Sequence, residues 1–281
     1  MTDHVHVRLT EAPGVDPSLA RKILDAPATE TVKENRRGRV VRVEIDGESY
    51  ARKHYPLRGA RRWLPFVSPS ARARRSWRAA EIASKLPLPL PEPICLLEGK
   101  KEAILVCRWF DGEPLHIWHA RHLAEGNLDS RSEKALFVWL GQSMAEIFAA
   151  GFRSCDMAPQ NLVLTGDPGG PWSLALVDLD DAFIDRSPTA REIEVSLAQL
   201  AHLPPTVSST CLKRALDSFL EAGGSRLLST SGGSTARRKL ERRISGQVLR
   251  LKRAKDGRMQ IKEKDPHRFS GWGLDRSGFP S

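Results

Sequence analysis

The chain has 281 residues, of which 40% are hydrophobic and 28% are charged. That length suits one two-lobed domain or two small ones, and the apolar share is enough to build a hydrophobic core. No stretch approaches the roughly 18 to 20 consecutive apolar residues of a membrane-spanning helix, which argues against such a helix.

The net charge of +10 is concentrated near the C-terminus. The segment Gly223–Ser281 holds 15 Lys and Arg residues against 5 Asp and Glu residues, so residues 1–222 are neutral as a whole. Inside that neutral part, Arg52–Arg78 holds nine basic residues and no acidic one. Basic patches attract polyanions of every kind, so charge alone does not choose among nucleic acid, anionic lipid and phosphorylated sugar.

The cysteines and the first residues indicate a cytoplasmic protein. Met1–Thr10 is polar and has no apolar core of the kind that a secretory signal needs. The four cysteines contain no C-x-x-C pair, which argues against a zinc site or a disulfide framework and favours reduced thiols. They are Cys95, Cys107, Cys155 and Cys211.

The first part of the chain predicts strands on either side of a helix. Asp46-Gly47 is a hairpin turn signal between two β-rich runs, and Ser70 can cap the N-terminus of a helix. Four closely spaced prolines then require an extended connector. The predicted elements are two strands within Arg39–Tyr55, a helix at about Ala71–Lys85, the connector Leu86–Pro93, and strands at Ile94–Leu97 and Ala103–Arg108.

The second part is mainly helical. Apolar residues recur at three- and four-residue steps from Glu133 to Ala150, which predicts a helix with one buried face. That face consists of Leu136, Leu140, Met144, Ile147 and Phe148. The other predicted elements are strands at Leu162–Leu164 and Ser173–Val177, helices at Thr189–His202 and Ser208–Ala222, a linker at Gly223–Ser234 and a basic helix at Thr235–Arg250.

This order predicts an α+β fold with a small β-rich N-lobe, a larger helical C-lobe and a cleft between them. The expected divisions are an N-terminal extension at 1–32, the N-lobe at 33–108, the C-lobe at 109–222, and a basic, partly mobile linker and tail at 223–281.

Two neighbouring segments contain the residues suited to phosphoryl transfer. Asp156 is followed five residues later by Asn161, on a loop that ends in an apolar β-run, and Asp178 ends the next strand. Transfer from ATP needs a carboxylate to orient the attacking hydroxyl and accept its proton, and oxygen ligands for Mg²⁺. Mg²⁺ favours such sparse oxygen sites, because it keeps several waters and phosphate oxygens in its shell.

The pattern D-x-x-x-x-N-x-x-L, followed by an Asp at a strand end, resembles the catalytic core of protein-kinase-like enzymes. Lys53 is similar to the strand lysine that grips the nucleotide phosphates, and Glu81 lies in the following helix, where the carboxylate partner of that lysine is expected. The segments Leu88–Pro93 and Ser196–Leu200 add to this pattern. The whole pattern most resembles the lipopolysaccharide kinase family, whose members phosphorylate Kdo or heptose. The resemblance covers roughly residues 33–222.

The resemblance implies ATP and Mg²⁺ as cofactors. By the same resemblance, Asp156 is the catalytic base, and Asn161 and Asp178 are the Mg²⁺ ligands. Lys53, braced by Glu81, holds the phosphates, and Gly38 belongs to the loop around Arg36–Arg39 that covers them. The chain departs from the kinase pattern in having Ser154-Cys155 where His-Arg is typical and one glycine in place of a glycine-rich run. No Ala-Pro-Glu segment follows Asp178, which favours a small-molecule or glycolipid acceptor over a protein.

Several alternatives stay open at this stage. The fold could serve as a catalytically impaired scaffold, or as an aminoglycoside-type phosphotransferase, although such enzymes tend to have acidic substrate pockets. A nucleic-acid-binding role is disfavoured because no recognised module is present. The basic segments are expected to contact an anionic glycolipid acceptor or the anionic inner-membrane surface, and the sequence leaves the oligomeric state open.

Two further patterns are interpreted structurally. His116, His119 and His122 recur at three-residue steps, which could indicate a metal site, but no carboxylate or cysteine is suitably interleaved. We interpret them as a solvated helix face. Cys155 has no nearby histidine to activate it, so it is interpreted as a small packed residue.

Overall fold

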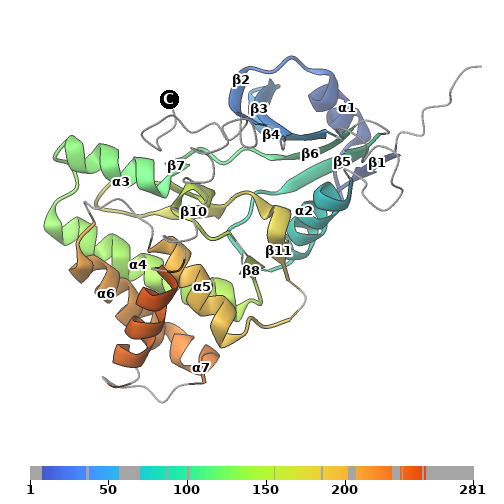
Figure 1. The fold of residues 1–281 in the computed structure, drawn as a ribbon. Coiled ribbons are helices and arrows are strands. Elements are labelled where there is room, and N and C mark those ends of the chain that lie inside the picture. The colour runs from blue at the N-terminus through green and yellow to red at the C-terminus, as the bar shows by residue number, and fades with distance from the viewer. Residues whose placement is uncertain are drawn as a thin grey trace, which may run out of the picture. The chain divides into compact units, whose positions relative to one another are not determined.

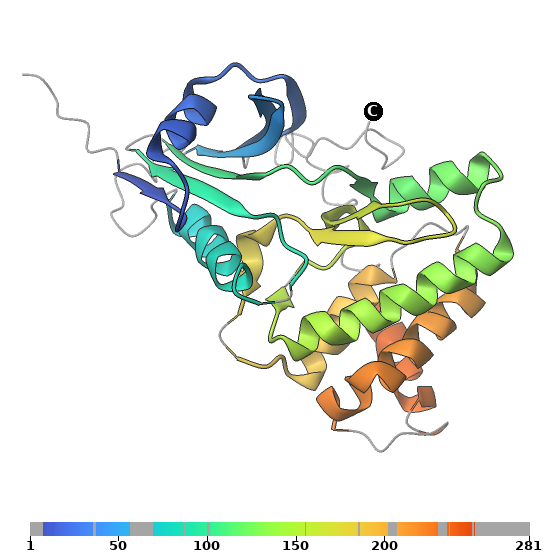
Figure 2. The same cartoon turned by 180° about the vertical axis from the view of Figure 1, so that it is seen from behind.

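A computed structural model describes the chain over residues 8–35, 38–56, 70–86, 88–99, 102–154, 156–184, 186–201, 207–229, 235, 237–248 and 250. Figures 1 and 2 trace its elements from opposite sides. The described residues form two compact units, one of residues up to Glu81 together with Glu92–Trp109, the other of Ile82–Pro91 together with residues from Phe110 onward. Each unit is described by itself below.

The first unit is built on a six-stranded antiparallel sheet with the strand order β1-β5-β6-β4-β3-β2. Both residues of the predicted turn Asp46-Gly47 have positive φ angles, 52° and 83°, as the two-residue turn of a tight hairpin requires. The strands are β1 (Arg8–Glu11), β2 (Glu30–Asn35), β3 (Gly38–Ile45), β4 (Glu48–Pro56), β5 (Pro93–Glu98) and β6 (Glu102–Arg108). The strand pairs predicted within Arg39–Tyr55 and Ile94–Arg108 are therefore confirmed.

Helix α1 (Pro17–Asp25) covers one face of this sheet. Its Ala20 and Ile23 pack against Val41, Val43 and other side chains on that face. Arg52 of β4, only 7% exposed, fixes the end of the helix. Its Nη1 donates hydrogen bonds to the carbonyl oxygens of Ile23, Leu24 and Ala26 at 3.0, 2.8 and 2.9 Å. A buried cation thus satisfies carbonyl groups that the helix end leaves without partners.

Helix α2 (Ser70–Ala83) covers the opposite face. Ala73 and Trp77 pack there with Tyr55 of β4 and with Leu96 and Leu105 of the neighbouring strands. The Tyr55 hydroxyl also donates to Ser76 Oγ at 3.3 Å. Since alternate residues of a strand share a face, Lys53 lies on the same side of the sheet as Tyr55.

The N-terminal residues differ from the sequence expectation, which places residues 1–32 outside the lobe as an extension. In the structure β1 pairs with β5 and β2 pairs with β3, so the two strands form opposite edges of the sheet. The sequence signal is weak because both strands are short and polar. The contact between Arg52 and the end of α1 fixes this segment to the lobe. The carbonyl groups that Arg52 binds lie 26 to 29 residues before it in the sequence.

The second unit is mainly helical, and its centre is the long helix α4. All five residues of the predicted apolar face of α4 are at most 2% exposed. A Cβ on Gly141 of α4 would lie 2.1 Å from the carbonyl oxygen of Ala215, so this glycine allows α4 and α6 to approach closely. The helices are α3 (Leu115–Ala124), α4 (Ser130–Ala149), α5 (Ala190–Leu200), α6 (Ser209–Phe219) and α7 (Ser225–Leu227), and the short strands are β7 (Glu113–Pro114), β8 (Arg153–Ser154), β9 (Leu162–Thr165), β10 (Ser173–Leu176) and β11 (Ala182–Phe183).

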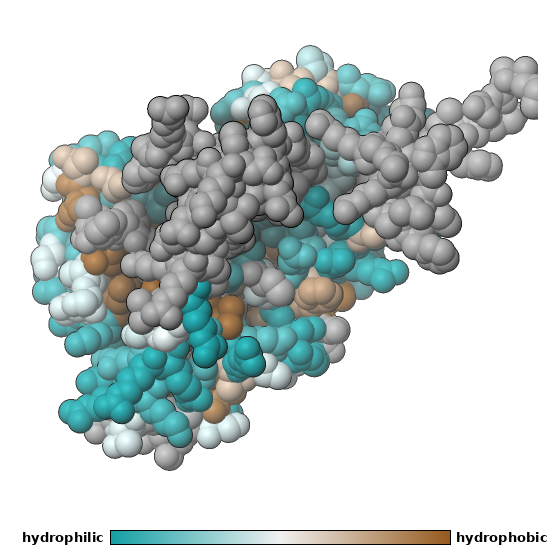
Figure 3. All heavy atoms as spheres, in the orientation of Figure 1, coloured by the Kyte–Doolittle hydropathy of each residue, from teal (hydrophilic) through white to brown (hydrophobic). Residues whose placement is uncertain are grey.

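Helical turns occupy the first residues of the predicted linker, whose residues 230–234 lie outside the described part of the chain. A π-helical turn, Leu220–Gly224, continues into α7, with Gly223 at a positive φ of 114°. Residues 237–248 are helical and dock on the unit through Leu240, which is 1% exposed, and through an ion pair of 2.9 Å between Arg243 Nη1 and Glu194 Oε1. Hydrophilic side chains cover the surface over these C-terminal helices (Figure 3). Residues 251–281 of the expected tail lie outside the described residues.

The interpretation of the α3 histidines as a solvated face is wrong for two of them. His119 is fully buried, with Nε2 2.9 Å from Glu133 Oε1 and its ring against Phe137. His122 is 8% exposed, and its ring centre lies 4.4 Å from that of Trp118. Helix α4 and Trp118 enclose these rings, which three-residue spacing alone does not reveal.

The structure describes three of the four cysteines and most of the predicted helices. Cys95, Cys107 and Cys211 are free thiols, whereas Cys155 lies outside the described residues. Within the part of the chain that the structure describes, no helix has the length and apolar character needed to cross a membrane.

Candidate active site

Asn161 and Asp178 emerge at the same end of one hairpin. Strands β9 and β10 pair antiparallel, with Leu162 opposite Leu176, so the residue before β9 and the residues after β10 are neighbours. A hydrogen bond of 2.9 Å from Val177 N to the Asn161 carbonyl oxygen extends this pairing by one step. The hairpin thus brings together the two residues expected to bind the metal.

Asn161 also joins Asp156 to this end of the hairpin. It is 6% exposed and closes the 3₁₀ turn η2 (Pro159–Asn161). Its Nδ2 donates to the carbonyl oxygen of Asp156 at 3.1 Å. Since the amide nitrogen is used in this bond, Oδ1 is the atom that a cation would bind. The exposed Asp156, at the start of the loop, is therefore held close to the end of the hairpin.

Asp178 has an uncommon backbone conformation. Its φ of 63° and ψ of 64° lie in the left-handed region, and it precedes the 3₁₀ turn η3 (Leu179–Asp181). Among residues other than glycine, Asp and Asn tolerate this region best. Such strained positions cluster at functional sites, where the surrounding structure holds them. This turn gives Asp178 a direction that a continuing strand would not.

Three side chains support the loop between β8 and β9. Ser154 Oγ accepts a hydrogen bond from Asp156 N at 3.0 Å, and Gln199 Oε1 of α5 accepts one from Met157 N at 2.8 Å. His116 of α3 binds the backbone of Pro159; burial lowers the pKa of His116, and this bond only partly offsets the effect. Ser154 thus supports the loop at a position where kinases typically have histidine. Sequence reasoning missed Gln199 and His116 as supports, although Gln199 lies in the segment Ser196–Leu200 that carries part of the resemblance.

A charged cluster anchors the strand that leads into the loop. The Oε1 atom of Glu192 in α5 accepts two hydrogen bonds. One comes from Arg186 Nη2 at 2.8 Å and the other from Arg153 Nη1 of β8 at 3.0 Å. It also forms a capping box with Thr189 at the start of α5. The hydrogen bond from Arg186 is the largest cause that lowers the pKa of Glu192, to about 2, and bonds from Thr189 and Arg153 add to it. The carboxylate therefore stays ionised across the physiological range.

Lys53 belongs to the first unit and lies at the middle of its sheet. It pairs with Val40 on one side and Leu105 on the other. Its Nζ lies 5.2 Å from the centre of the Tyr55 ring, within the range of a cation–π contact. Burial raises the pKa of the neighbouring Cys107 thiol to about 12, and the charge of Lys53 opposes this effect. Lys53 therefore lies on the face of the sheet that α2 covers.

Glu81 and Gly38 occupy the elements that the sequence predicts for them. Glu81 is in α2, four residues after the buried Trp77, and residues at this spacing share one side of a helix. Gly38 begins β3 with a φ of 157°, and a Cβ there would lie 2.2 Å from the carbonyl oxygen of His54. Glycine at 38 is thus required for the contact between β3 and β4, whatever its part in covering a nucleotide. Arg36 and Arg37 of the expected loop lie outside the described residues.

The donor set at the hairpin end fits Mg²⁺ better than a transition metal. Asn161 and Asp178 offer an amide oxygen and a carboxylate, which are hard ligands of the kind that Mg²⁺ prefers. In the described part of the chain, no three His, Cys, Asp or Glu side chains converge as a metal site. A Mg²⁺ ion held by Asn161 and Asp178 would take the rest of its shell from water and phosphate.

Comparisons with known proteins identify the fold. No family model matches the sequence, and no curated protein matches it either. Among solved structures, the chain is similar to WaaP in complex with acyl carrier protein, with a TM-score of 0.60 and 17% sequence identity over 89% of this chain and 98% of that chain. The fold is protein-kinase-like. The predicted class, with a β-rich N-terminal part and a helical C-terminal part, is confirmed. Because 1614 chains match, this likeness identifies a fold and not a substrate.

Proposed function

We propose that the chain is an ATP- and Mg²⁺-dependent phosphotransferase that phosphorylates a sugar hydroxyl, namely Kdo or heptose of the lipopolysaccharide core. The observation that carries the proposal is the pair of hydrogen bonds that Asn161 makes at the end of the β9–β10 hairpin. Its side-chain amide donates to the carbonyl oxygen of Asp156, and its own carbonyl oxygen accepts from Val177 N, the residue before Asp178. The protein-kinase-like fold adds support, because the order of these residues along the chain resembles that of the base and the metal ligands in such enzymes.

Each residue has a role that its surroundings suit. Asp156 is exposed, so its carboxylate can accept the proton of an acceptor hydroxyl while Ser154 and Gln199 hold its loop. Asn161 and Asp178 would hold Mg²⁺, which supplies positive charge against the phosphates. Lys53 lies on the sheet face that α2 covers, and α2 contains Glu81. The ammonium group of Lys53 would bind the nucleotide phosphates as a point charge.

The acceptor class follows from the chain between Asp178 and α5. Helix α5 begins at Ala190, which leaves little chain for the segment on which a protein substrate would dock. The basic segments favour an anionic glycolipid over a cationic drug. We therefore assign the activity to the cytoplasmic side of an anionic membrane surface, with no nucleic-acid partner.

Transfer assays with the full chain test the proposal. The protein is incubated with radiolabelled ATP, Mg²⁺ and extracted lipopolysaccharide, and label is followed into lipid, protein and free phosphate. Asp156→Asn is expected to lower turnover by about 10² to 10⁴, the usual contribution of a general base. Asp167→Asn, the same change in the turn at the other end of the hairpin, should leave it unchanged. Equal transfer by the natural chain and Asp156→Asn on every acceptor would favour the scaffold alternative.

Thermal unfolding separates binding from chemistry. ATP should raise the melting temperature only with Mg²⁺ present, because a ligand stabilises the state that binds it. Asp178→Asn should abolish this shift, whereas Asp156→Asn should keep it. A shift of the same size without metal, or one that survives in Asp178→Asn, contradicts the assignment of the metal ligands.

A further inference from the structure

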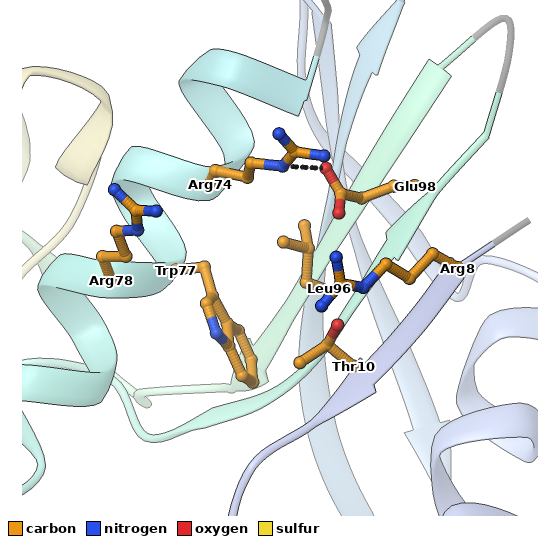
Figure 4. A pocket seen from close by; sticks show the side chains of 7 residues that line it. All are labelled: Arg8, Thr10, Arg74, Trp77, Arg78, Leu96 and Glu98. Carbon is orange, nitrogen blue, oxygen red and sulfur yellow. Dashed lines mark hydrogen bonds and ion pairs between the residues drawn. The ribbon is translucent and has the colours of Figure 1, made fainter.

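A small pocket opens at the edge of the first unit, between α2 and strands β1 and β5 (Figure 4). Thr10 and Leu96 belong to its strand side, and Trp77 of α2 lies along it at 6% exposure. The volume of the pocket is about 200 Å³. That is more than ten times the roughly 15 Å³ that one water molecule needs. It is also below the roughly 300 Å³ at which pockets for drug-sized ligands begin, so the pocket suits a small group rather than a whole nucleotide.

The charged side chains at this pocket are three arginines and one glutamate. Arg8 comes from β1, Arg74 and Arg78 come from α2, and Glu98 comes from β5 (Figure 4). Glu98 is 9% exposed, and its carboxylate accepts a hydrogen bond of 2.5 Å from Arg74 Nε. Arg8 lies directly across from Glu98 in the β1–β5 register. Among the residues that line the pocket, three arginines thus stand against one carboxylate, so two positive charges remain in excess.

The excess charge is available to a ligand. Arg8 and Arg78 are exposed and form no ion pair with any residue that the structure describes. Arg74 uses its Nε in the bond to Glu98, which leaves the two terminal nitrogens of its planar fork for another acceptor. Like charges that line one pocket repel one another, and an anion bound in the pocket would reduce that repulsion. Guanidinium groups bind phosphate oxygens in paired hydrogen bonds, which makes phosphate the best match.

We propose that this pocket is a binding site for the phosphate group of a phosphomonoester, formed by Arg8, Arg74 and Arg78. It is separate from the residues assigned to phosphoryl transfer. Leu96 pairs with Leu105, and Leu105 pairs with Lys53, so the pocket strand lies two strands, or roughly 10 Å, from Lys53. The site therefore does not depend on the proposed activity.

Calorimetric titration of the full chain with inorganic phosphate and with glycerol 3-phosphate at low salt tests the site. Arg8→Gln and Arg78→Gln are each expected to weaken binding about tenfold, the effect of losing one or two charge-assisted hydrogen bonds. Arg21→Gln removes the same charge from α1, on the opposite face of the sheet, and should leave the affinity unchanged. Far-UV circular dichroism and the melting temperature establish that each variant is folded.

Two further variants test the sign of the charge effect and the separation from the nucleotide site. Glu98→Gln removes the one competing carboxylate and is expected to tighten phosphate binding about three- to tenfold, a gain that misfolding cannot produce. Lys53→Met should keep the binding of inorganic phosphate. Binding that survives in Arg8→Gln and Arg78→Gln, that falls equally in Arg21→Gln, or that disappears in Lys53→Met alone would overturn the proposal.

Vesicles identify the source of the phosphate. Phosphatidylcholine vesicles with and without phosphatidic acid are sedimented with the natural chain and with Arg8→Gln. Sedimentation that requires both phosphatidic acid and Arg8 assigns the site to a lipid headgroup. Binding of glycerol 3-phosphate without such sedimentation supports the same site with a soluble phosphate ester as its ligand.

Discussion

Replacing Glu192 by Gln should destabilise the protein at neutral pH and have little effect in acid. The amide keeps the shape of the side chain and can still complete a capping box with Thr189, so the change isolates the negative charge. The pKa of Glu192 falls from 4.5 to about 2 in the folded chain, chiefly because of Arg186. At about 1.4 kcal/mol per pKa unit, that shift corresponds to roughly 3 kcal/mol before screening by solvent.

Solvent screening lowers this figure. The Glu192 side chain is 35% exposed, and exposed ion pairs contribute far less than buried ones. We therefore expect a loss of about 1 to 2 kcal/mol at pH 7. A carboxyl group with a depressed folded-state pKa adds stability above its unfolded pKa of about 4.5. That contribution is lost as the pH falls towards 2, so the difference between natural chain and variant should shrink over this interval.

Urea unfolding at pH 7, 5 and 3.5, followed by circular dichroism, measures this difference. Glu221→Gln is the matched control, because Glu221 is exposed in the π-helical turn after α6 and its replacement should cost less than about 0.5 kcal/mol. A destabilisation by Glu192→Gln that is the same at all three pH values, or that grows in acid, would refute the reasoning.

Two other substitutions test contacts that the sequence does not reveal. Arg52→Met should lower the free energy of unfolding by about 3 kcal/mol, because buried carbonyl groups at the end of α1 lose a charged donor. The measurement is urea unfolding, and a loss below about 1 kcal/mol would mean that water replaces the guanidinium. Gln199→Ala should lower kcat more than it raises KM in the transfer assay, since it frees the backbone of Met157 beside Asp156. A change in KM alone would contradict a role for Gln199 in positioning the loop.

Local signals predicted the elements of the fold well. The Asp46-Gly47 turn, the apolar face of α4 and the strands on either side of the proline-rich connector each depend on residues close in sequence. Contacts between distant residues were not predictable in this way. Arg52 reaches carbonyl groups up to 29 residues away, and Gln199 supports a backbone nitrogen 42 residues away.

For the candidate site, sequence supplied the residue types and their order, and structure supplied the geometry within each unit. The β9–β10 pairing explains why Asn161 and Asp178 are neighbours. The left-handed backbone of Asp178 was not predictable, because no glycine marks that position. The support from Ser154 likewise depends on a side-chain hydrogen bond to Asp156 N that no spacing rule indicates.

The arrangement of the sheet edges has a consequence for synthesis on the ribosome. Both edge strands come from the first 35 residues, yet β1 pairs with β5, whose Cys95 lies opposite Glu11. About 80 further residues must be made before β1 can pair, which takes on the order of 4 to 16 seconds at typical translation rates. During that interval the nascent segment has unpaired backbone groups and exposed apolar residues of α1, features that favour aggregation. Because β6 joins β5 to β4, the first unit should complete its fold only after both β5 and β6 have left the ribosome, although β1 is made much earlier.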